Sequence, residues 1–225
     1  MSVVPLTRNQ NVVTSQELFA KKGGVEGSSL LILHCDDRQL DGSGTNVCYD
    51  LRVGARYRDH REEHSCDLAD DDMIAMLPGS AVIIQTEEEF HFPRQMFGYV
   101  VPKVLMLQQG ISNTTSKVDP GYHGPLLVTV FNLGKQKVML ARRSCICTLV
   151  VHSVGPEARL YPGSAKQITG KAKTGWRFRF RQFSDKLDQH HTLILAILCI
   201  VGIFEIFARL WPLFAEIAKW VSRHL

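Results

Sequence analysis

Residues 117–131 read KVDPGYHGPLLVTVF. Asp119-Pro120-Gly121 is a strong turn signal, because proline fixes one backbone angle and glycine tolerates a positive one. The residues that follow, 125–131, are mostly apolar and branched, and their number suits a single β-strand. The stretch therefore predicts a turn followed by a largely buried strand.

The same alternation of turn and strand continues through the first two thirds of the chain. Further turn signals are Asp41-Gly42, Pro78-Gly79 and Leu133-Gly134. Several short strands at such spacing indicate an all-β barrel or sandwich, here with one short helix at residues 15–22. The expected strands are SLLILHC (29–35), AVIIQT (81–86), GYVVPKVLML (98–107), PLLVTVF (125–131), KVMLA (137–141) and CICTLVV (145–151).

Composition and cysteine spacing limit the classes of function. Hydrophobic residues make up 45% and charged residues 21%, which is typical of a globular domain. The six cysteines form no C-x-x-C pair, and the first residues lack a basic start followed by an apolar run. These features predict reduced cysteines, no metal site and a cytosolic β domain. Phosphate-binding loops of the G-x-x-x-x-G-K-[ST] type and G-x-S-x-G nucleophile elbows do not occur in the sequence.

The net charge of +4 is concentrated in one segment. Residues 170–186 carry a net +5, so the rest of the chain sums to about −1. This distribution argues against a nucleic-acid partner.

The C-terminal residues differ in kind from the rest. Residues 192–210 form an apolar run close to the roughly 20 residues that a membrane helix needs. Glu205 interrupts the run near its far end, and Trp211-Pro212 ends it. Residues 213–225 have the spacing of an interfacial amphipathic helix. The alternatives are a buried amphipathic helix or a helix that packs in an oligomer.

Arg177, Arg179 and Arg181 alternate with phenylalanines just before this run. Arginines beside a membrane span are held on the cytoplasmic side, although an edge strand with one polar face would show the same alternation. We therefore expect a β domain at residues 1–152, a basic arm at 153–186 and a membrane part at 187–225. The expected location is the inner membrane, with the β domain in the cytoplasm.

Residues 15–151 resemble the superfamily of dCTP deaminases and dUTPases, and they are closer to its deaminase branch. VCYDLRVGARY (47–57) is similar to the first motif of that family, and MLPGSAVIIQTEEEFHFP (76–93) to its central strand pair. KVDPGYHG (117–124) resembles its sugar-binding turn, and VFNLGK (130–135) the strand and turn that follow. The resemblance implies a β-barrel or jelly-roll fold, a homotrimer and nucleotide sites between subunits.

The implied ligand is a deoxyribonucleoside triphosphate, accompanied by Mg²⁺ if the protein is active. Asp119 would contact the sugar 3′-hydroxyl or position a water molecule, since a carboxylate accepts hydrogen bonds and can act as a base. The nucleotide-binding residues predicted in this way are Asp119, Lys117, Lys103, Tyr122 and Gln108.

The sequence departs from the family pattern where catalysis would occur. The phosphate motif glycine-arginine-serine-serine is replaced by residues 102–105, PKVL, and the further arginine by Gln108. The catalytic glutamate, three residues before Asn132, is replaced by Thr129. Tyr161, Lys166 and Gln167 only faintly resemble the family's C-terminal lid.

Three functions fit these observations. We expect a membrane-anchored domain that binds a deoxynucleotide or related ligand without efficient catalysis, as a sensor, effector or scaffold. The alternatives are an active dCTP deaminase or dUTP diphosphatase with rearranged residues, and a structural trimer whose pocket is empty.

Overall fold

The computed structural model describes residues 2–41, 46–60, 65–165 and 167–168, and then residues 199–200, 202–203, 205, 208 and 210–212. The chain divides into two compact units, residues 1–173 and residues 174–225. We call the first the β unit, and each unit is described by itself.

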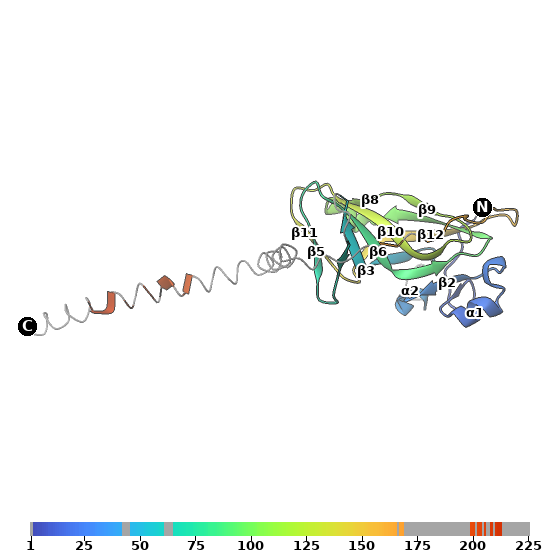
Figure 1. The fold of residues 1–225 in the computed structure, drawn as a ribbon, viewed down its shortest axis with the longest axis horizontal. Coiled ribbons are helices and arrows are strands. Elements are labelled where there is room, and N and C mark those ends of the chain that lie inside the picture. The colour runs from blue at the N-terminus through green and yellow to red at the C-terminus, as the bar shows by residue number, and fades with distance from the viewer. Residues whose placement is uncertain are drawn as a thin grey trace, which may run out of the picture. The chain divides into compact units, whose positions relative to one another are not determined.

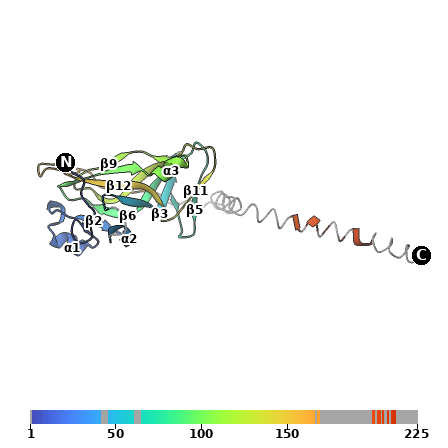
Figure 2. The ribbon, with the colours of Figure 1, turned by 180° about the vertical axis from the view of Figure 1, so that it is seen from behind.

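The β unit consists mainly of strands (Figures 1 and 2). Its strands are β1 (Val12–Val13), β2 (Leu30–Leu33), β3 (Tyr49–Asp59), β4 (Cys66–Asp67), β5 (Met73–Met76), β6 (Ala81–His91), β7 (Met96–Pro102), β8 (Ile111–Asn113), β9 (Ser116–Val118), β10 (His123–Asn132), β11 (Val138–Ala141) and β12 (Cys145–Ser153). Its helices are α1 (Gln16–Lys21), the 3₁₀ turn η1 (Gly24–Glu26), α2 (Asp37–Leu40) and α3 (Val104–Gln108).

Strand β3 joins the two halves of the main sheet. Its residues 49–52 pair with β12, which continues to β7 and β9, whereas residues 53–59 pair with β6. Strand β6 in turn pairs with β2 and β10. Gly54 lies where β3 changes partner, and a Cβ atom there would be 2.5 Å from the carbonyl oxygen of Gln85. Glycine is therefore required at this crossing, because the two backbones approach too closely for a side chain.

Alternating side chains from both halves meet in one apolar core. Along β6 the pattern of buried and half-buried residues alternates for nearly the whole strand, as expected when one face packs inward. Tyr49, Phe90 and Phe92 are among the largest side chains that are fully buried. The all-β class is confirmed, but the described strands form no closed barrel. The main sheet runs from β1 to β9 with β10 and β8 branching from β6, and β5 and β11 form a separate two-stranded sheet.

Two local predictions had different outcomes. The helix expected at residues 15–22 is confirmed as α1, whose first turn is capped by the Ser15 hydroxyl accepting from the amide of Leu18. The single strand expected at residues 98–107 is wrong, because β7 ends at Pro102 and α3 follows. Leucine, methionine and glutamine are good helix formers, and Gly110, with φ 78°, ends this short helical segment.

The predicted membrane part falls mainly outside the described residues, as do Arg177, Arg179 and Arg181. Every described residue between positions 199 and 212 is helical, and the side chains of Glu205 and Trp211 are exposed there. Within the described part of the chain, no helix is both long enough and apolar enough to cross a membrane.

Candidate functional site

The turn between β9 and β10 holds the first candidate side chains. The Nζ atom of Lys117 lies 2.7 Å from Oδ1 of Asp119, and the amide of Tyr122 donates to the carbonyl oxygen of Asp119. Gly121 has φ 76°, a conformation that residues with side chains rarely adopt. The predicted turn is therefore present, and it places Asp119 beside Lys117.

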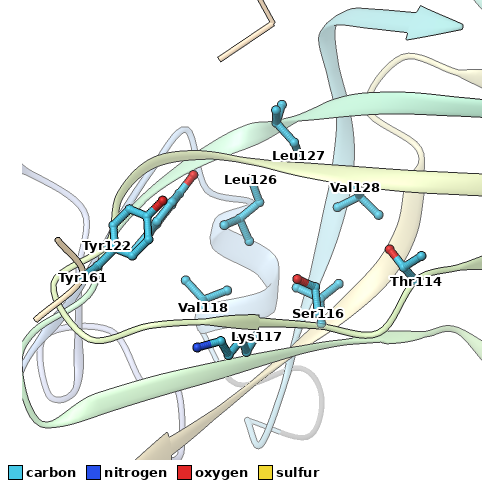
Figure 3. A pocket seen from close by; sticks show the side chains of 10 residues that line it. Thr114, Ser116, Lys117, Val118, Tyr122, Leu126, Leu127, Val128 and Tyr161 are labelled. Atoms are coloured by element: carbon cyan, nitrogen blue, oxygen red, sulfur yellow. The ribbon is translucent and has the colours of Figure 1, made fainter. Parts of the chain in front are cut away.

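The two strands that meet at this turn diverge and leave a cavity between them. β9 pairs with β7, whereas β10 pairs with β6 and β8. The cavity measures about 170 Å³. Its lining residues are Val100, Thr114, Ser116, Lys117, Val118, Tyr122, Leu126, Leu127, Val128 and Tyr161. Figure 3 shows the two tyrosines together at one end of the cavity and Thr114 at the other.

Tyr122 and Tyr161 form an aromatic pair with ring centroids 5.6 Å apart. The Tyr122 hydroxyl donates to the carbonyl oxygen of Pro125. Burial raises the pKa of Tyr122 to about 12, and the neighbouring Tyr161 adds to the effect. At neutral pH this phenol is therefore protonated and acts as a hydrogen-bond donor rather than as a base.

Residues 160–165 of the arm lie against the same turn. The amide of Tyr161 donates to the carbonyl oxygen of Pro120 at 2.7 Å. A Cβ atom on Gly121 would lie 2.8 Å from Cδ2 of Leu160, and one on Gly124 would lie 2.5 Å from Cβ of Ala165. The two glycines thus make room for the arm, and the arm places Tyr161 at the cavity.

A second polar cluster lies where β7 ends. The Nζ atom of Lys103 donates to Oδ2 of Asp50, and the Thr148 hydroxyl donates to Oδ1 of the same carboxylate at 2.7 Å. The Gln39 side chain binds both the amide and the carbonyl oxygen of Asp50, which holds that residue in place. Both carboxylate oxygens of Asp50 and the ammonium group of Lys103 are therefore engaged within the chain.

A buried ion pair joins β3 to β6. Arg52 Nε lies 2.6 Å from Oε1 of Glu88, whose side chain is 0% exposed, and the Arg52 amide donates to Oε2 at 3.0 Å. The hydroxyl of Tyr49 also donates to Glu88. Burial raises the pKa of Glu88, while the hydrogen bonds from Arg52 act in the opposite direction. Glu88 therefore holds β3 against β6.

The structure brings together only part of the predicted set. Lys117 and Tyr122 line the cavity with Asp119 beside them, whereas Lys103 belongs to the Asp50 cluster and Gln108 is exposed at the end of α3. Sequence reasoning missed Thr114, Ser116 and the partners of Lys103. Asp50 and Thr148 lie opposite each other on β3 and β12, a pairing without any local sequence signal.

Thr129 lies on β10 but is not part of the cavity lining. It is opposite Ile83 of β6, which is opposite Arg58 of β3. Residues directly opposite in antiparallel strands share a face, so these three side chains form one row. The Nε atom of Arg58 is buried and has no hydrogen-bond partner among the described residues.

The dCTP deaminase-like family model matches residues 29–154, more than half of the chain. The chain belongs to this family. It is 32% identical over 82 residues to the deoxyuridine 5′-triphosphate nucleotidohydrolase of Escherichia phage T5, covering 36% of this chain and 55% of that protein. It is 30% identical over 74 residues to the dCTP deaminase of Buchnera aphidicola, covering 32% of this chain and 38% of that protein.

This dCTP deaminase-like chain thus spans about half the length of the relatives that it matches, or less. Among solved structures, the 2′-deoxycytidine 5′-triphosphate deaminase of Agrobacterium tumefaciens aligns with a TM-score of 0.45 and 19% identity. The alignment covers 53% of this chain and 40% of that one.

Among the described residues of this dCTP deaminase-like chain, neither Asp50 nor Asp119 is a ready ligand for Mg²⁺. Magnesium is usually held by one or two carboxylates together with substrate phosphates. Asp50 is engaged by Lys103 and Thr148, and Asp119 by Lys117. In the described residues, no three histidine, cysteine or acidic side chains are grouped for a metal ion.

Proposed function

We propose that this dCTP deaminase-like chain binds a deoxynucleoside or deoxynucleotide in the β9–β10 cavity without catalysing its turnover efficiently. The side chains at the cavity support this proposal. The cavity has Lys117, two tyrosines and Asp119 at its edge, whereas Thr129, at the position where the resemblance implies a catalytic glutamate, is outside its lining. The chain therefore has groups that can hold a ligand but lacks the implied proton shuttle.

The loss of that proton shuttle would have a large effect on rate. A positioned general acid or base contributes about 10²–10⁴-fold, and a threonine hydroxyl does not titrate near neutral pH. Tyr122 is no substitute, because burial raises its pKa to about 12. Asp119 is the remaining candidate, and it is held in an ion pair with Lys117.

The proposal has two further parts that depend on the rest of the sequence. Residues 192–210 would tether the chain to the inner membrane with the β unit in the cytoplasm, and three chains would associate as the family resemblance implies. Ligand occupancy would then be sensed at a membrane surface. Support for the tether comes from the apolar run itself, which approaches the length that a membrane helix needs.

The decisive experiment compares binding and turnover on the same sample. The purified 225-residue chain in detergent is incubated with dCTP or dUTP, with and without Mg²⁺, and products are quantified alongside calorimetric binding. We expect saturable binding, no turnover above a protein-free control, and loss of binding in Asp119→Ala. Turnover that disappears in Asp119→Ala would show instead an active enzyme, and absence of all binding would favour a structural role.

The membrane tether is tested by fractionation with alkaline washing. We expect the unmodified chain to remain with membranes and Ile203→Asp to be released, because a second carboxylate in the apolar run is costly. Glu205→Leu is the matched control and should stay bound. Release of the unmodified chain by the wash would contradict the tether.

A further inference from the structure

The cavity carries little charge with which to hold phosphates. Among the described side chains that line it, Lys117 alone is charged, and Asp119 lies 2.7 Å from its ammonium group. Proteins usually bind phosphates with charge-assisted hydrogen bonds, often from bidentate arginines. A phosphate in this cavity would therefore have to compete with Asp119 for one lysine.

The next cation along the chain is also engaged. β7 leaves the cavity at Val100 and ends just before Lys103, whose ammonium group is bound by Asp50. The exposed positions that follow are apolar, with Val104 68% and Leu105 67% exposed. These side chains have no polar atom that could donate to a phosphate oxygen.

The rest of the lining suits an uncharged ring. Val100, Val118, Leu126 and Val128 provide apolar walls, and the two tyrosines provide aromatic faces at one end. Thr114 and Ser116 add hydroxyl groups that can donate or accept hydrogen bonds. The volume of about 170 Å³ is below the roughly 300–1,000 Å³ typical of sites for drug-sized ligands. Such a cavity accepts a small heteroaromatic group but not a whole nucleoside triphosphate.

We propose that the cavity recognises a nucleoside or a free nucleobase and that phosphates add little to its affinity. This inference rests on the proposed function, since it specifies the ligand of the same site. On this proposal the chain differs from an enzyme that selects triphosphates. The contacts that distinguish one ligand from another would all be made with the ring and the sugar.

The test compares ligands that differ only in phosphate number. Binding of deoxycytidine, deoxyuridine and their 5′-mono- and triphosphates to the 225-residue chain is measured by calorimetry at low and high NaCl, with and without Mg²⁺. For the preferred base, we expect nucleoside and triphosphate affinities within about threefold and nearly independent of salt. A triphosphate that binds at least tenfold more tightly, with an advantage that shrinks in high salt, would overturn the inference while leaving the proposed function intact.

Two variants make the outcome specific to the cavity. Tyr161→Ala removes one aromatic face and should weaken nucleoside binding by tenfold or more. Lys103→Ala lies outside the cavity and should change nucleoside and triphosphate affinities equally or not at all. A selective loss of triphosphate affinity in Lys103→Ala would show that this lysine binds phosphate and would contradict the inference. Failure of every ligand to bind would refute both the inference and the proposed function.

Discussion

The amide nitrogen of Tyr161 lies 2.7 Å from the carbonyl oxygen of Pro120, so the arm is fastened to the turn that carries Asp119. Further along the arm, Ala165 lies against Gly124, and the buried Ile168 donates its amide to the side chain of Gln85. The arm therefore belongs to the β unit as far as residue 168. A substitution in the turn should therefore disturb the packing of this whole segment.

Gly124→Ala should loosen the arm. Gly124 has φ 118°, and an added Cβ atom would lie 2.5 Å from Cβ of Ala165, so either the turn or the arm must shift. We expect a lower free energy of unfolding in urea and faster hydrogen exchange in residues 158–168. Gly79→Ala is the matched control, because Gly79 also has positive φ, 74°, but an added Cβ atom there would have no atom of a non-adjacent residue within 4 Å.

The control isolates the backbone cost, which is about 1–2 kcal/mol for a residue with a side chain in the left-handed region. Gly124→Ala should exceed that cost and Gly79→Ala should not, and exchange in the arm should respond only to the first. Equal effects of the two substitutions on stability and exchange would show that the arm does not depend on Gly124.

Glu88→Gln should destabilise the β unit strongly. The substitution keeps the shape of the side chain but leaves the guanidinium of Arg52 next to a neutral amide inside the protein. Removing one partner of a buried ion pair typically costs about 3–5 kcal/mol, because the remaining charge is uncompensated. Equilibrium urea denaturation measures the change in unfolding free energy.

Glu26→Gln is the matched control for Glu88→Gln. Glu26 also pairs with an arginine, Arg94, at 2.6 Å, but its side chain is 64% exposed. Exposed pairs contribute little because water solvates and screens both charges. We therefore expect almost no change in stability for this variant. A similarly small effect of Glu88→Gln would mean that Arg52 finds another partner.

Glu88 also shows what the sequence could and could not reveal. The alternation along β6 predicts a strand, but residues 87–89 are three consecutive glutamates, and only the strand register decides that Glu88 faces inward. The Lys103–Asp50 contact joins residues far apart in sequence, so no local sequence pattern predicts it. By contrast, the Lys117–Asp119 turn was predictable, because every feature that fixes it lies within a few residues.

The sequence pattern does not reveal helix α3 either. A short apolar run does not distinguish a strand from a helix, and residues 104–107 continue the apolar character of the preceding strand after only Pro102 and Lys103. Pro102 marks the boundary only in retrospect, since proline is also compatible with the end of a strand. The exposure of Val104 and Leu105 could not be inferred from their apolar character.

Protonation of His91 should lower the free energy of unfolding of the β unit as the pH falls below about 6.5. Burial lowers the pKa of His91, and the nearby His123 lowers it further, while Glu89 acts in the opposite direction. The folded protein therefore binds fewer protons here than the unfolded chain, whose histidines titrate near pH 6.5. The contribution of His91 to the free energy of unfolding is therefore complete above pH 6.5. It is lost as the pH falls through the lowered pKa of His91 in the folded state.

The melting temperature between pH 7.5 and pH 5.5 measures this effect. His91→Gln should flatten the slope, and acid should speed hydrogen exchange in α1, because Gln16 and Phe19 contact the His91 ring. His152→Gln, which removes a histidine from β12, is the matched control. A slope that is the same in His91→Gln as in the unmodified chain would assign the acid sensitivity to other groups.

Thr129→Glu should not create a deaminase. The new carboxylate would share its row with Ile83 and Arg58, and adjacent strands lie about 4.8 Å apart, so a glutamate can approach Arg58 across Ile83. The buried Nε of Arg58 would then gain an acceptor. We expect equal or higher stability in urea and no turnover of dCTP.

Thr129→Gln is the isosteric control and should gain less stability, because a neutral amide makes weaker hydrogen bonds with a guanidinium. Deamination by Thr129→Glu but not by Thr129→Gln would show instead that the missing carboxylate alone had silenced the site.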